Sequence, residues 1–315
     1  MAVLSRTSSF RILRLISQGG QGSVFLGYDK RLQRRVAIKV YRLPIGTDLR
    51  RRLRREAQLV ARIQSHRVVQ VYDIIESSSY VALIMEYVPG CSLQDFLSEA
   101  HPSLVSILTL GADISEALAL AQEKHIIHGD VKAANVLITD CGRAKLIDFG
   151  IAKCKGDASS RQWEAGSFST LSPEQYLGKP LDERIDLFAL GCLLYRMLSG
   201  EQPFFRNGRP DPNLLLNFSA PSLTDIVGVN TALPDRVVEL IDELLEKEPG
   251  NRTINMCNVR QTLRSVLQTL SVASSEGLLL EARPYFRCEA PDPIYKRLAY
   301  QRLLGGARRG RPRKQ

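Results

Sequence analysis

The hydrophobic pattern changes its period along the chain, and this change restricts the fold more than any other feature. Residues 10–43 contain short aliphatic and β-branched runs broken by glycine and charged turns, which predicts an antiparallel meander. Residues 48–63 then place apolar side chains at helical spacing, and VVQVYDIIE and YVALIMEYV return to strand character. We therefore expect a five-stranded antiparallel sheet with one helix in the first part of the chain.

From Ser92 onward the pattern is mainly helical. The segments LTLGADISEALALAQEKH, DLFALGCLLYRMLSG and RVVELIDELLEK each carry apolar residues three and four positions apart over more than two turns. A strand-rich part followed by a helix-rich part predicts an α+β fold with two lobes, about 10–88 and about 92–268. We expect an extension at 1–9, one folded domain at 10–268 and a basic extension at 269–315 that is flexible at its end.

The composition predicts a folded chain, and the charge is distributed unevenly along it. The 315 residues are 44% hydrophobic and 24% charged, which is ordinary for a globular protein. The net charge is +10, and residues 277–315 hold ten Lys/Arg against three Asp/Glu, a net +7. Such a tail is most often a solvated end. The alternative is that it binds an acidic partner, anionic lipid or nucleic acid. Within it RRGRPRK resembles the core of an AT-hook, which lies in the narrow A·T minor groove.

The cysteines and the hydropathy of the chain indicate its cellular compartment and whether it inserts into a membrane. The six cysteines contain no CxxC pair, which argues against a zinc site or disulfide framework and favours a reducing compartment. No apolar run approaches the roughly 20 residues that cross a bilayer, and MAVLSRTSSF lacks the apolar core of a signal peptide. We expect a cytoplasmic protein without membrane insertion.

A glycine-rich turn, ISQGGQGSV at 16–24, lies between two strand-like runs. Glycines let the backbone approach phosphate oxygens and present its N–H groups, although most such turns are only hairpins. Lys39, in VAIK, follows Val24 by fifteen residues at the end of a strand. A lysine in an apolar strand needs a partner for its charge, and Glu56 in the following arginine-rich helix could supply it.

The stretch HGDVKAANVLITD, residues 128–140, places a carboxylate, an ammonium group and a carboxamide in one short loop. Asp130 could orient the proton of an attacking hydroxyl, and Lys132 could neutralise a transferring phosphoryl group. Asn135, together with Asp148 in LIDFG, could hold Mg²⁺ against phosphates. These residues therefore predict a phosphoryl-transfer site.

With these motifs the chain resembles the protein kinase family, specifically the eukaryotic-like serine/threonine kinases of bacteria, over about residues 10–268. The resemblance also covers MEYVPGCSL, DFGIAK, SPEQ, DERIDLFALGCLLYRMLSGEQPF and KEPGNR. It implies transfer of the γ-phosphate of ATP to serine or threonine hydroxyls of protein substrates, with autophosphorylation and with Mg²⁺, or alternatively Mn²⁺, as the metal. Lys132 in DVKAAN and Ser167 in GSFSTLSPE resemble the pattern of serine/threonine specificity.

The resemblance also assigns residues to roles. It implies that Asp130 and Lys132 are catalytic residues. Lys39 is expected to bind the phosphates and to pair with Glu56. Asn135 and Asp148 are the expected metal ligands. Met85 is the expected gatekeeper, the backbone of Glu86 and Val88 meets adenine, Leu137 closes the pocket floor and Asp95 lies beside the ribose. The full expected nucleotide set is Ile16, Gly19, Gly22, Val24, Ala37, Lys39, Met85, Glu86, Val88, Asp95 and Leu137. Glu174 with Arg252 is the expected buried ion pair, and Asp186 the acid that holds the catalytic loop.

Departures from the family pattern keep other functions open. Ser17 and Gln21 replace usual glycine-rich loop residues, and a pseudokinase scaffold or nucleotide-binding module is one alternative. A kinase tethered to DNA by its tail is another. Gly129 stands where many kinases carry arginine, a non-RD pattern that weakens the electrostatic reason for activation by loop phosphorylation. The run RRRLRR at 50–55 is a solvated helix face or a receiver for an acidic partner. The expected phosphorylation candidates are Ser159, Ser160, Ser169 and Thr170.

Overall fold

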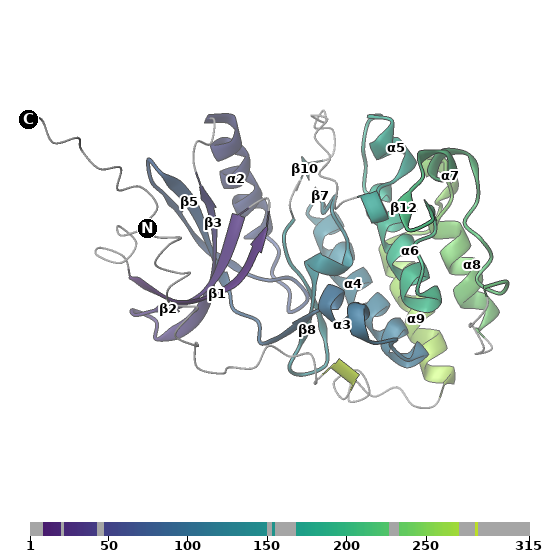
Figure 1. The fold of residues 1–315 in the computed structure, drawn as a ribbon, viewed down its shortest axis with the longest axis horizontal. Helices are drawn as coiled ribbons and strands as arrows, with labels where there is room; N and C mark the ends of the chain where they lie inside the picture. The colour runs from purple at the N-terminus through teal and green to yellow at the C-terminus, as the bar shows by residue number, and fades with distance from the viewer. Residues whose placement is uncertain are drawn as a thin grey trace, which may run out of the picture. The chain divides into compact units, whose positions relative to one another are not determined.

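The computed structural model describes residues 9–19, 22–42, 47–149, 153–154, 168–226, 233–270 and 281–282. The described residues form two compact units (Figure 1). Unit 1 contains those of Met1–Arg52 and Val71–Tyr87, and unit 2 contains those of Leu53–Gln70 and Val88–Arg287.

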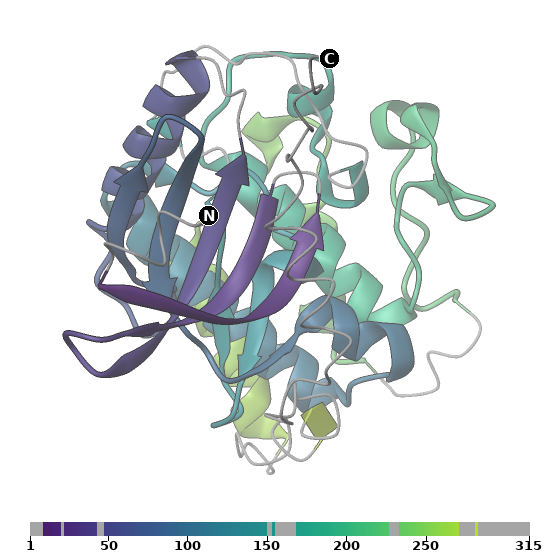
Figure 2. The ribbon, with the colours of Figure 1, turned by 60° about the vertical axis from the view of Figure 1, so that its left-hand side comes forward.

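Unit 1 is built on a five-stranded antiparallel sheet with the order β1-β2-β3-β5-β4, which confirms the prediction. Figure 2 shows β1, β2 and β3 side by side in purple. Helix α2, Thr47–Val60, begins in this unit and continues into unit 2. The strands are β1 Phe10–Gly19, β2 Gly22–Asp29, β3 Arg34–Arg42, β4 Val71–Glu76 and β5 Tyr80–Glu86.

The two faces of this sheet differ in what they bury. Alternate residues of a strand point to opposite faces, and Val36, Ile38 and Val40 of β3 lie in a buried cluster with Phe25 and Ile84. The intervening residues of β3 therefore belong to the other face. The strand pattern of VAIKV thus supplies both a hydrophobic core and a second surface that carries a lysine.

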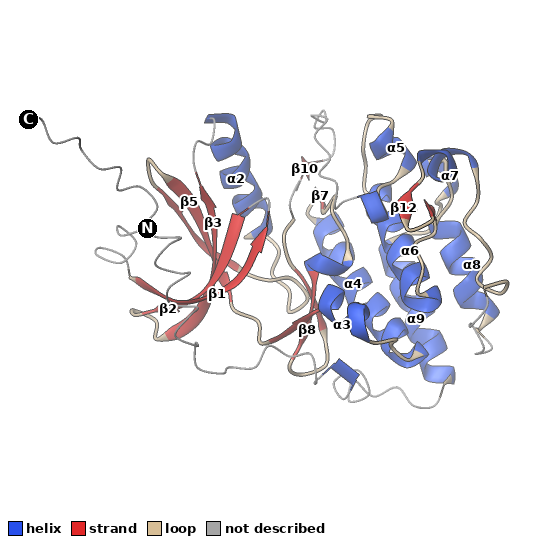
Figure 3. Ribbon diagram, viewed as in Figure 1, coloured by secondary structure: helices blue, strands red, loops and turns tan. Residues whose placement is uncertain are grey.

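Unit 2 is mainly helical, as the sequence predicted, and its helices are blue in Figure 3. Its short strands form a three-stranded sheet β6-β8-β9 and two pairs, β7 with β10 and β11 with β12. The helices are α3 Leu93–Glu99, α4 Leu104–Glu123, α5 Pro173–Tyr176, α6 Arg184–Ser199, α7 Pro212–Asn217, α8 Asp235–Leu244 and α9 Met256–Thr269, with 3-10 turns η1 Ala133–Asn135, η2 Phe168–Thr170 and η3 Pro249–Asn251. The strands are β6 Gly90–Ser92, β7 Ile126–Ile127, β8 Val136–Thr139, β9 Ala144–Leu146, β10 Lys153–Cys154, β11 Phe205–Arg206 and β12 Arg209–Pro210.

Two glycines let the helices of unit 2 approach closely. A Cβ atom at Gly111 of α4 would lie 2.8 Å from Leu194 of α6 and 3.0 Å from Leu263 of α9. A Cβ atom at Gly191 of α6 would lie 2.8 Å from the Cβ atom of Leu244 in α8. Interiors are close-packed, so a larger side chain at either position would push a neighbouring helix away. Helices α4 and α8 therefore pack closely against α6, the helix that carries Asp186.

Helix α4 is the one helix among the described residues that is long and apolar enough to span a membrane by length and composition, with a mean hydropathy of 1.6. However, 72% of that window is buried inside the structure, as in the core helix of a folded unit. Asp113 and Glu116 interrupt the apolar run, so a search for consecutive apolar residues passes over this helix. By itself the helix is weak evidence for a membrane span.

Candidate active site

Four of the expected nucleotide-binding residues share one face of the sheet in unit 1. The strand register pairs Lys39 with Val24 on β2, and Ala37 with Met85 on β5. Residues directly opposite each other in a sheet point to the same side. Lys39 is 5% exposed and its Nζ lies 5.4 Å from the ring centroid of Tyr41, on the same face. The sheet therefore brings these side chains together on the face opposite the buried cluster.

Two glycines of the glycine-rich turn, Gly19 and Gly22, lie among the described residues. Gly22 has φ +147°, and a Cβ atom there would lie 2.5 Å from the carbonyl oxygen of Val40, so only glycine fits. Gly19 ends β1 with open space around it. Ile16 lies in a register shift between the β1 residues Leu15 and Ser17. A shift of this kind changes the direction of the side chain that it contains.

The other expected nucleotide residues lie on several elements. Glu86 ends β5 and pairs with Val36, and Val88 follows in unit 2. Asp95 lies in the first turn of α3, where its N–H donates to the cap residue Ser92. Leu137 of β8 pairs with Ser92 of β6 and is partly buried. Glu56 of α2 belongs to unit 2 and Lys39 to unit 1, so their pairing stays a prediction.

In unit 2 the structure brings together three residues of the loop that the sequence singled out. The side chain of Asp130 is 9% exposed, and its Oδ2 lies 2.7 Å from Nζ of Lys132. Asn135 Nδ2 donates to the same Oδ2 and to the backbone carbonyl of Asp130, both at 2.9 Å. A nearly buried carboxylate is thus held by a cation and an amide. The predicted cluster of Asp130, Lys132 and Asn135 exists.

The donor atoms of Asn135 and Asp148 suit a hard divalent cation. Because Asn135 uses its nitrogen toward Asp130, the other polar atom of its amide is an oxygen, which Mg²⁺ prefers. The backbone N–H of Ile147 donates to the carbonyl of Asn135 at 3.0 Å and ties the two segments together. Asp148 has φ +52°, a left-handed conformation that aspartate tolerates better than most residues. The residues present therefore fit a metal site.

Asp186 holds the catalytic loop through its backbone, as expected. Its two carboxylate oxygens accept the backbone N–H groups of His128 and Gly129, each at 2.8 Å. The carboxyl group is 1% exposed, and burial raises its pKa to about 7 from the usual 3.8, while the two N–H donors oppose that rise. This bidentate contact fixes the backbone just before Asp130.

His128 links the catalytic loop to the segment that contains Asp148. Its Nδ1 accepts the N–H of Asp130 at 3.2 Å, so the ring proton lies on Nε2, 3.2 Å from the carbonyl of Ile147. The ring is also 4.4 Å from that of Phe149, centroid to centroid. Complete burial lowers the pKa of His128 to about 4. A neutral imidazole therefore holds both segments.

The predicted ion pair between Glu174 and Arg252 is bidentate and buried. Arg252 Nη1 and Nη2 lie 2.6 and 2.8 Å from the two oxygens of Glu174, and neither side chain is more than 3% exposed. The guanidinium also donates to the carbonyls of Glu246, Arg184 and Lys247 at 2.8 to 3.1 Å. Arg252 therefore ties α5 to the start of α6 and to the segment before η3.

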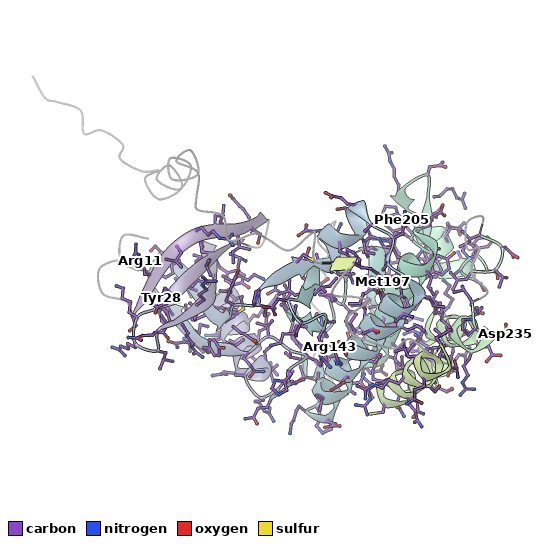
Figure 4. All side chains as sticks on the ribbon, turned by 90° about the horizontal axis from the view of Figure 1, so that it is seen from below. Arg11, Tyr28, Arg143, Met197, Phe205 and Asp235 are labelled. Carbon is purple, nitrogen blue, oxygen red and sulfur yellow. The ribbon has the colours of Figure 1, made fainter. Side chains whose placement is uncertain are left out.

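Two polar groups of unit 2 were missed by the sequence reasoning. Asp113 of α4 binds the guanidinium groups of Arg143 and Arg67 at 2.6 and 3.1 Å (Figure 4 labels Arg143). Burial raises the pKa of Asp113 to about 6. The only signal in the sequence is an acid at an apolar position of a helix. Gln175 is the second, and the S-x-x-Q pattern of a capping box was its signal.

Several predicted residues lie outside the described residues. They include Gln21 of the glycine-rich turn, Ser159 and Ser160 as phosphorylation candidates, Ser167, and the basic end at 305–315 with its AT-hook-like sequence. Of the remaining phosphorylation candidates, Ser169 and Thr170 form part of η2, and Thr170 is buried.

A five-stranded antiparallel unit and a helical unit whose loop joins Asp130, Lys132 and Asn135 define the architecture of a protein kinase. The chain belongs to this family, because residues 10–264 match the protein kinase domain.

Several curated relatives of this chain are bacterial proteins. The chain is 36% identical over 289 residues to the serine/threonine-protein kinase pkn2 of Myxococcus xanthus, covering 85% of this chain and 34% of that protein. It is 32% identical over 250 residues to the serine/threonine-protein kinase PrkC of Bacillus subtilis, covering 77% and 38%. It is 38% identical over 200 residues to the serine/threonine-protein kinase PknB of Mycobacterium leprae, covering 60% and 32%. The chain thus spans about a third of the length of these relatives.

Proposed function

We propose that this chain is a serine/threonine protein kinase that transfers the γ-phosphate of ATP to hydroxyls of protein substrates, including its own. The cluster of Asp130, Lys132 and Asn135 carries this proposal. The bacterial relatives named as serine/threonine-protein kinases support the choice of serine and threonine, as does Lys132 within DVKAAN.

Each residue of the cluster has a distinct chemical task. Asp130 accepts or orients the proton of the substrate hydroxyl, and Asn135 keeps its carboxylate in place through one N–H. Lys132 stands 2.7 Å from that carboxylate, where its charge also reaches a phosphoryl group in transfer. A buried carboxylate with two fixed partners loses little entropy when a hydroxyl arrives, which is the benefit of positioning.

We infer Mg²⁺ as the metal, with Mn²⁺ as the alternative, and assign Asn135 and Asp148 to hold it. When bound, the ion neutralises the charge of the nucleotide phosphates. The oxygen of the Asn135 amide and the carboxylate of Asp148 are hard ligands, and they suit Mg²⁺ better than a soft metal. ATP is assigned to the surface of unit 1 that presents Val24, Ala37 and Met85, with Lys39 for its phosphates.

The proposal is tested by phosphate transfer from labelled ATP with Mg²⁺ to a generic basic protein and to the chain itself. Asp130→Asn and Lys39→Met should each lower the rate by roughly 100-fold or more, because general acid–base and phosphate-positioning groups contribute at that level. Asp140→Asn, an exposed acid in the β8–β9 turn, is the matched control and should keep the wild-type rate.

Folding is checked by the unfolding midpoint of each variant in urea. Wild-type rates in folded Asp130→Asn would contradict the catalytic assignment. ATP binding without transfer by the wild-type chain would favour the pseudokinase alternative instead.

A further inference from the structure

We propose that Gln175 is a positioning residue for the catalytic loop, acting through the carbonyl of Gly129, the residue before Asp130. Its side-chain Nε2 donates to that carbonyl at 3.2 Å across 46 positions of sequence. The inference rests on the proposed kinase function, since it concerns how Asp130 is held for catalysis.

The peptide bond between Gly129 and Asp130 is held from both sides. Its carbonyl accepts from Gln175, and its N–H, which belongs to Asp130, donates to Nδ1 of His128 at 3.2 Å. A peptide unit is planar, so two hydrogen bonds on opposite edges fix its orientation. That orientation sets the direction in which the Cα–Cβ bond of Asp130 leaves the backbone. The residue before it is fixed as well, because the N–H of Gly129 donates to Asp186.

Gln175 is itself rigid. It forms a capping box with Ser172: the Ser172 N–H donates to Oε1 of Gln175 at 3.0 Å, and the Gln175 N–H donates to the hydroxyl of Ser172 at 3.3 Å. The side chain of Gln175 is 3% exposed. Its oxygen therefore serves α5 and its nitrogen serves the catalytic loop. One amide group performs both tasks, and its orientation follows from the capping box.

Helix α5 is a firm base for this contact. The neighbouring residue, Glu174, makes the buried ion pair with Arg252, which also binds three backbone carbonyls. Gln175 thus extends from an element that cannot shift without breaking a buried charge pair.

The contact also fits the glycine at position 129. Gly129 has φ +74°, a conformation that favours glycine, and it offers no side chain through which the loop could be held. The bond from Gln175 joins two neutral groups and uses only the backbone of Gly129. It therefore positions the loop without a phosphate group.

Gln175→Glu isolates the proposed bond. The new carboxylate keeps the length of the side chain and the oxygen that caps α5, because S-x-x-E is also a capping box. It loses the N–H donor and turns an oxygen toward the carbonyl of Gly129. At pH 8 we expect kcat to fall about tenfold or more, from the loss of a buried hydrogen bond to an unsatisfied carbonyl. The KM for ATP should stay within about twofold, because uniform binding is unaffected.

The pH profile distinguishes positioning from a general loss of structure. Burial at this position disfavours the ionised form of the new carboxyl group and raises its pKa. The protonated carboxyl group donates an O–H, so kcat of Gln175→Glu relative to wild type should recover as the pH falls from 8 to 6. Gln261→Glu, an exposed change of the same chemistry on α9, should follow the wild-type profile. Ser172→Ala removes the hydroxyl half of the capping box but keeps the Ser172 N–H that binds Oε1 of Gln175. It should lower the unfolding midpoint, and its kcat relative to wild type should not change between pH 8 and 6.

The outcomes separate this inference from the proposed function. If wild-type protein transfers no phosphate, the proposed function fails. If the wild type is active, Asp130→Asn is inactive and Gln175→Glu either keeps its kcat at pH 8 or loses it equally at all pH values, the positioning role is overturned. Should Gln175→Glu not fold, Gln175→Met replaces it: a lower kcat at unchanged KM for ATP supports the role, and an unchanged kcat overturns it.

Discussion

Replacing Glu174 by alanine leaves the guanidinium of Arg252 buried beside a cavity, with none of its side chain exposed. Removing one partner of a buried ion pair costs about 3–5 kcal/mol. Three carbonyls still accept from Arg252, at 2.8 to 3.1 Å, so we expect the lower end of that range, about 3 kcal/mol. For a domain of this size each kcal/mol shifts the unfolding temperature by about 2–4 °C, which predicts a loss of about 6–12 °C.

The assay is thermal unfolding followed by circular dichroism, with Glu239→Ala as the control because it removes an exposed glutamate of α8. Arg252→Met should lose at least as much stability as Glu174→Ala, since it also leaves three buried carbonyls without their donor. Glu174→Gln keeps an acceptor oxygen and should fall between wild type and Glu174→Ala. A shift below about 2 °C in Glu174→Ala, equal to that of the control, would refute the reasoning that this pair is buried and mutually dependent.

Three further predictions concern the catalytic loop and its surroundings. Asp148→Asn should lower phosphate transfer by roughly 100-fold at saturating Mg²⁺ without moving the urea midpoint, because asparagine tolerates the positive φ of this position; wild-type activity would remove the metal assignment. Burial lowers the pKa of His128 from 6.5 to about 4. The contribution of the neutral ring to folding stability is therefore fully present above pH 6.5 and is lost as the pH falls through 4. The raised pKa of Asp186 changes folding stability with pH in the opposite direction. The difference in urea midpoints between wild type and His128→Phe, followed from pH 7.5 to 4, therefore isolates the effect of the histidine. A difference that stays constant with pH would contradict this prediction. Phosphatase-treated protein should keep most of its activity toward an added substrate, since Gly129 supplies no cation for a phosphate, and loss of activity on treatment would show that reasoning to be wrong.

Local pattern was sufficient for the five strands of unit 1, for α2 and for the helices α4, α6 and α8 of unit 2. In VAIKV the alternation of large apolar residues with Ala37 and Lys39 predicted a strand, and the structure places the apolar set in the core and Lys39 on the other face. Helix boundaries were less secure. The helical pattern of 48–63 ends in the structure at Val60, where the chain turns. Periodicity reports which side of an element is buried, and it is weak on where the element ends.

The site was predictable where one short loop holds its residues. Asp130, Lys132 and Asn135 lie within six positions, so their meeting follows from local geometry. Two contacts between distant segments gave no such signal, whereas the Glu174–Arg252 pair was expected only from the family resemblance. Asp113 is 30 positions from Arg143, and Gln175 is 46 from Gly129. Neither residue type indicates which residue it will contact, because the packing of α4, α5 and α6 against the loops determines which groups meet.

The supports of the catalytic loop act on its backbone more than on its side chains. Asp186 binds two N–H groups of the loop, Gln175 binds one carbonyl, and His128 binds the N–H of Asp130. Of the residues 128–130, only His128 uses its side chain as a support, and Asp130 keeps its carboxylate for Lys132 and Asn135. Gly129 has no side chain, and it takes part in these supports through its backbone N–H and carbonyl alone. Its positive φ turns the two neighbouring peptide units so that Asp186 and Gln175 can bind them from different elements. Glycine at position 129 thus permits a loop that is held by fixed hydrogen bonds from α5 and α6.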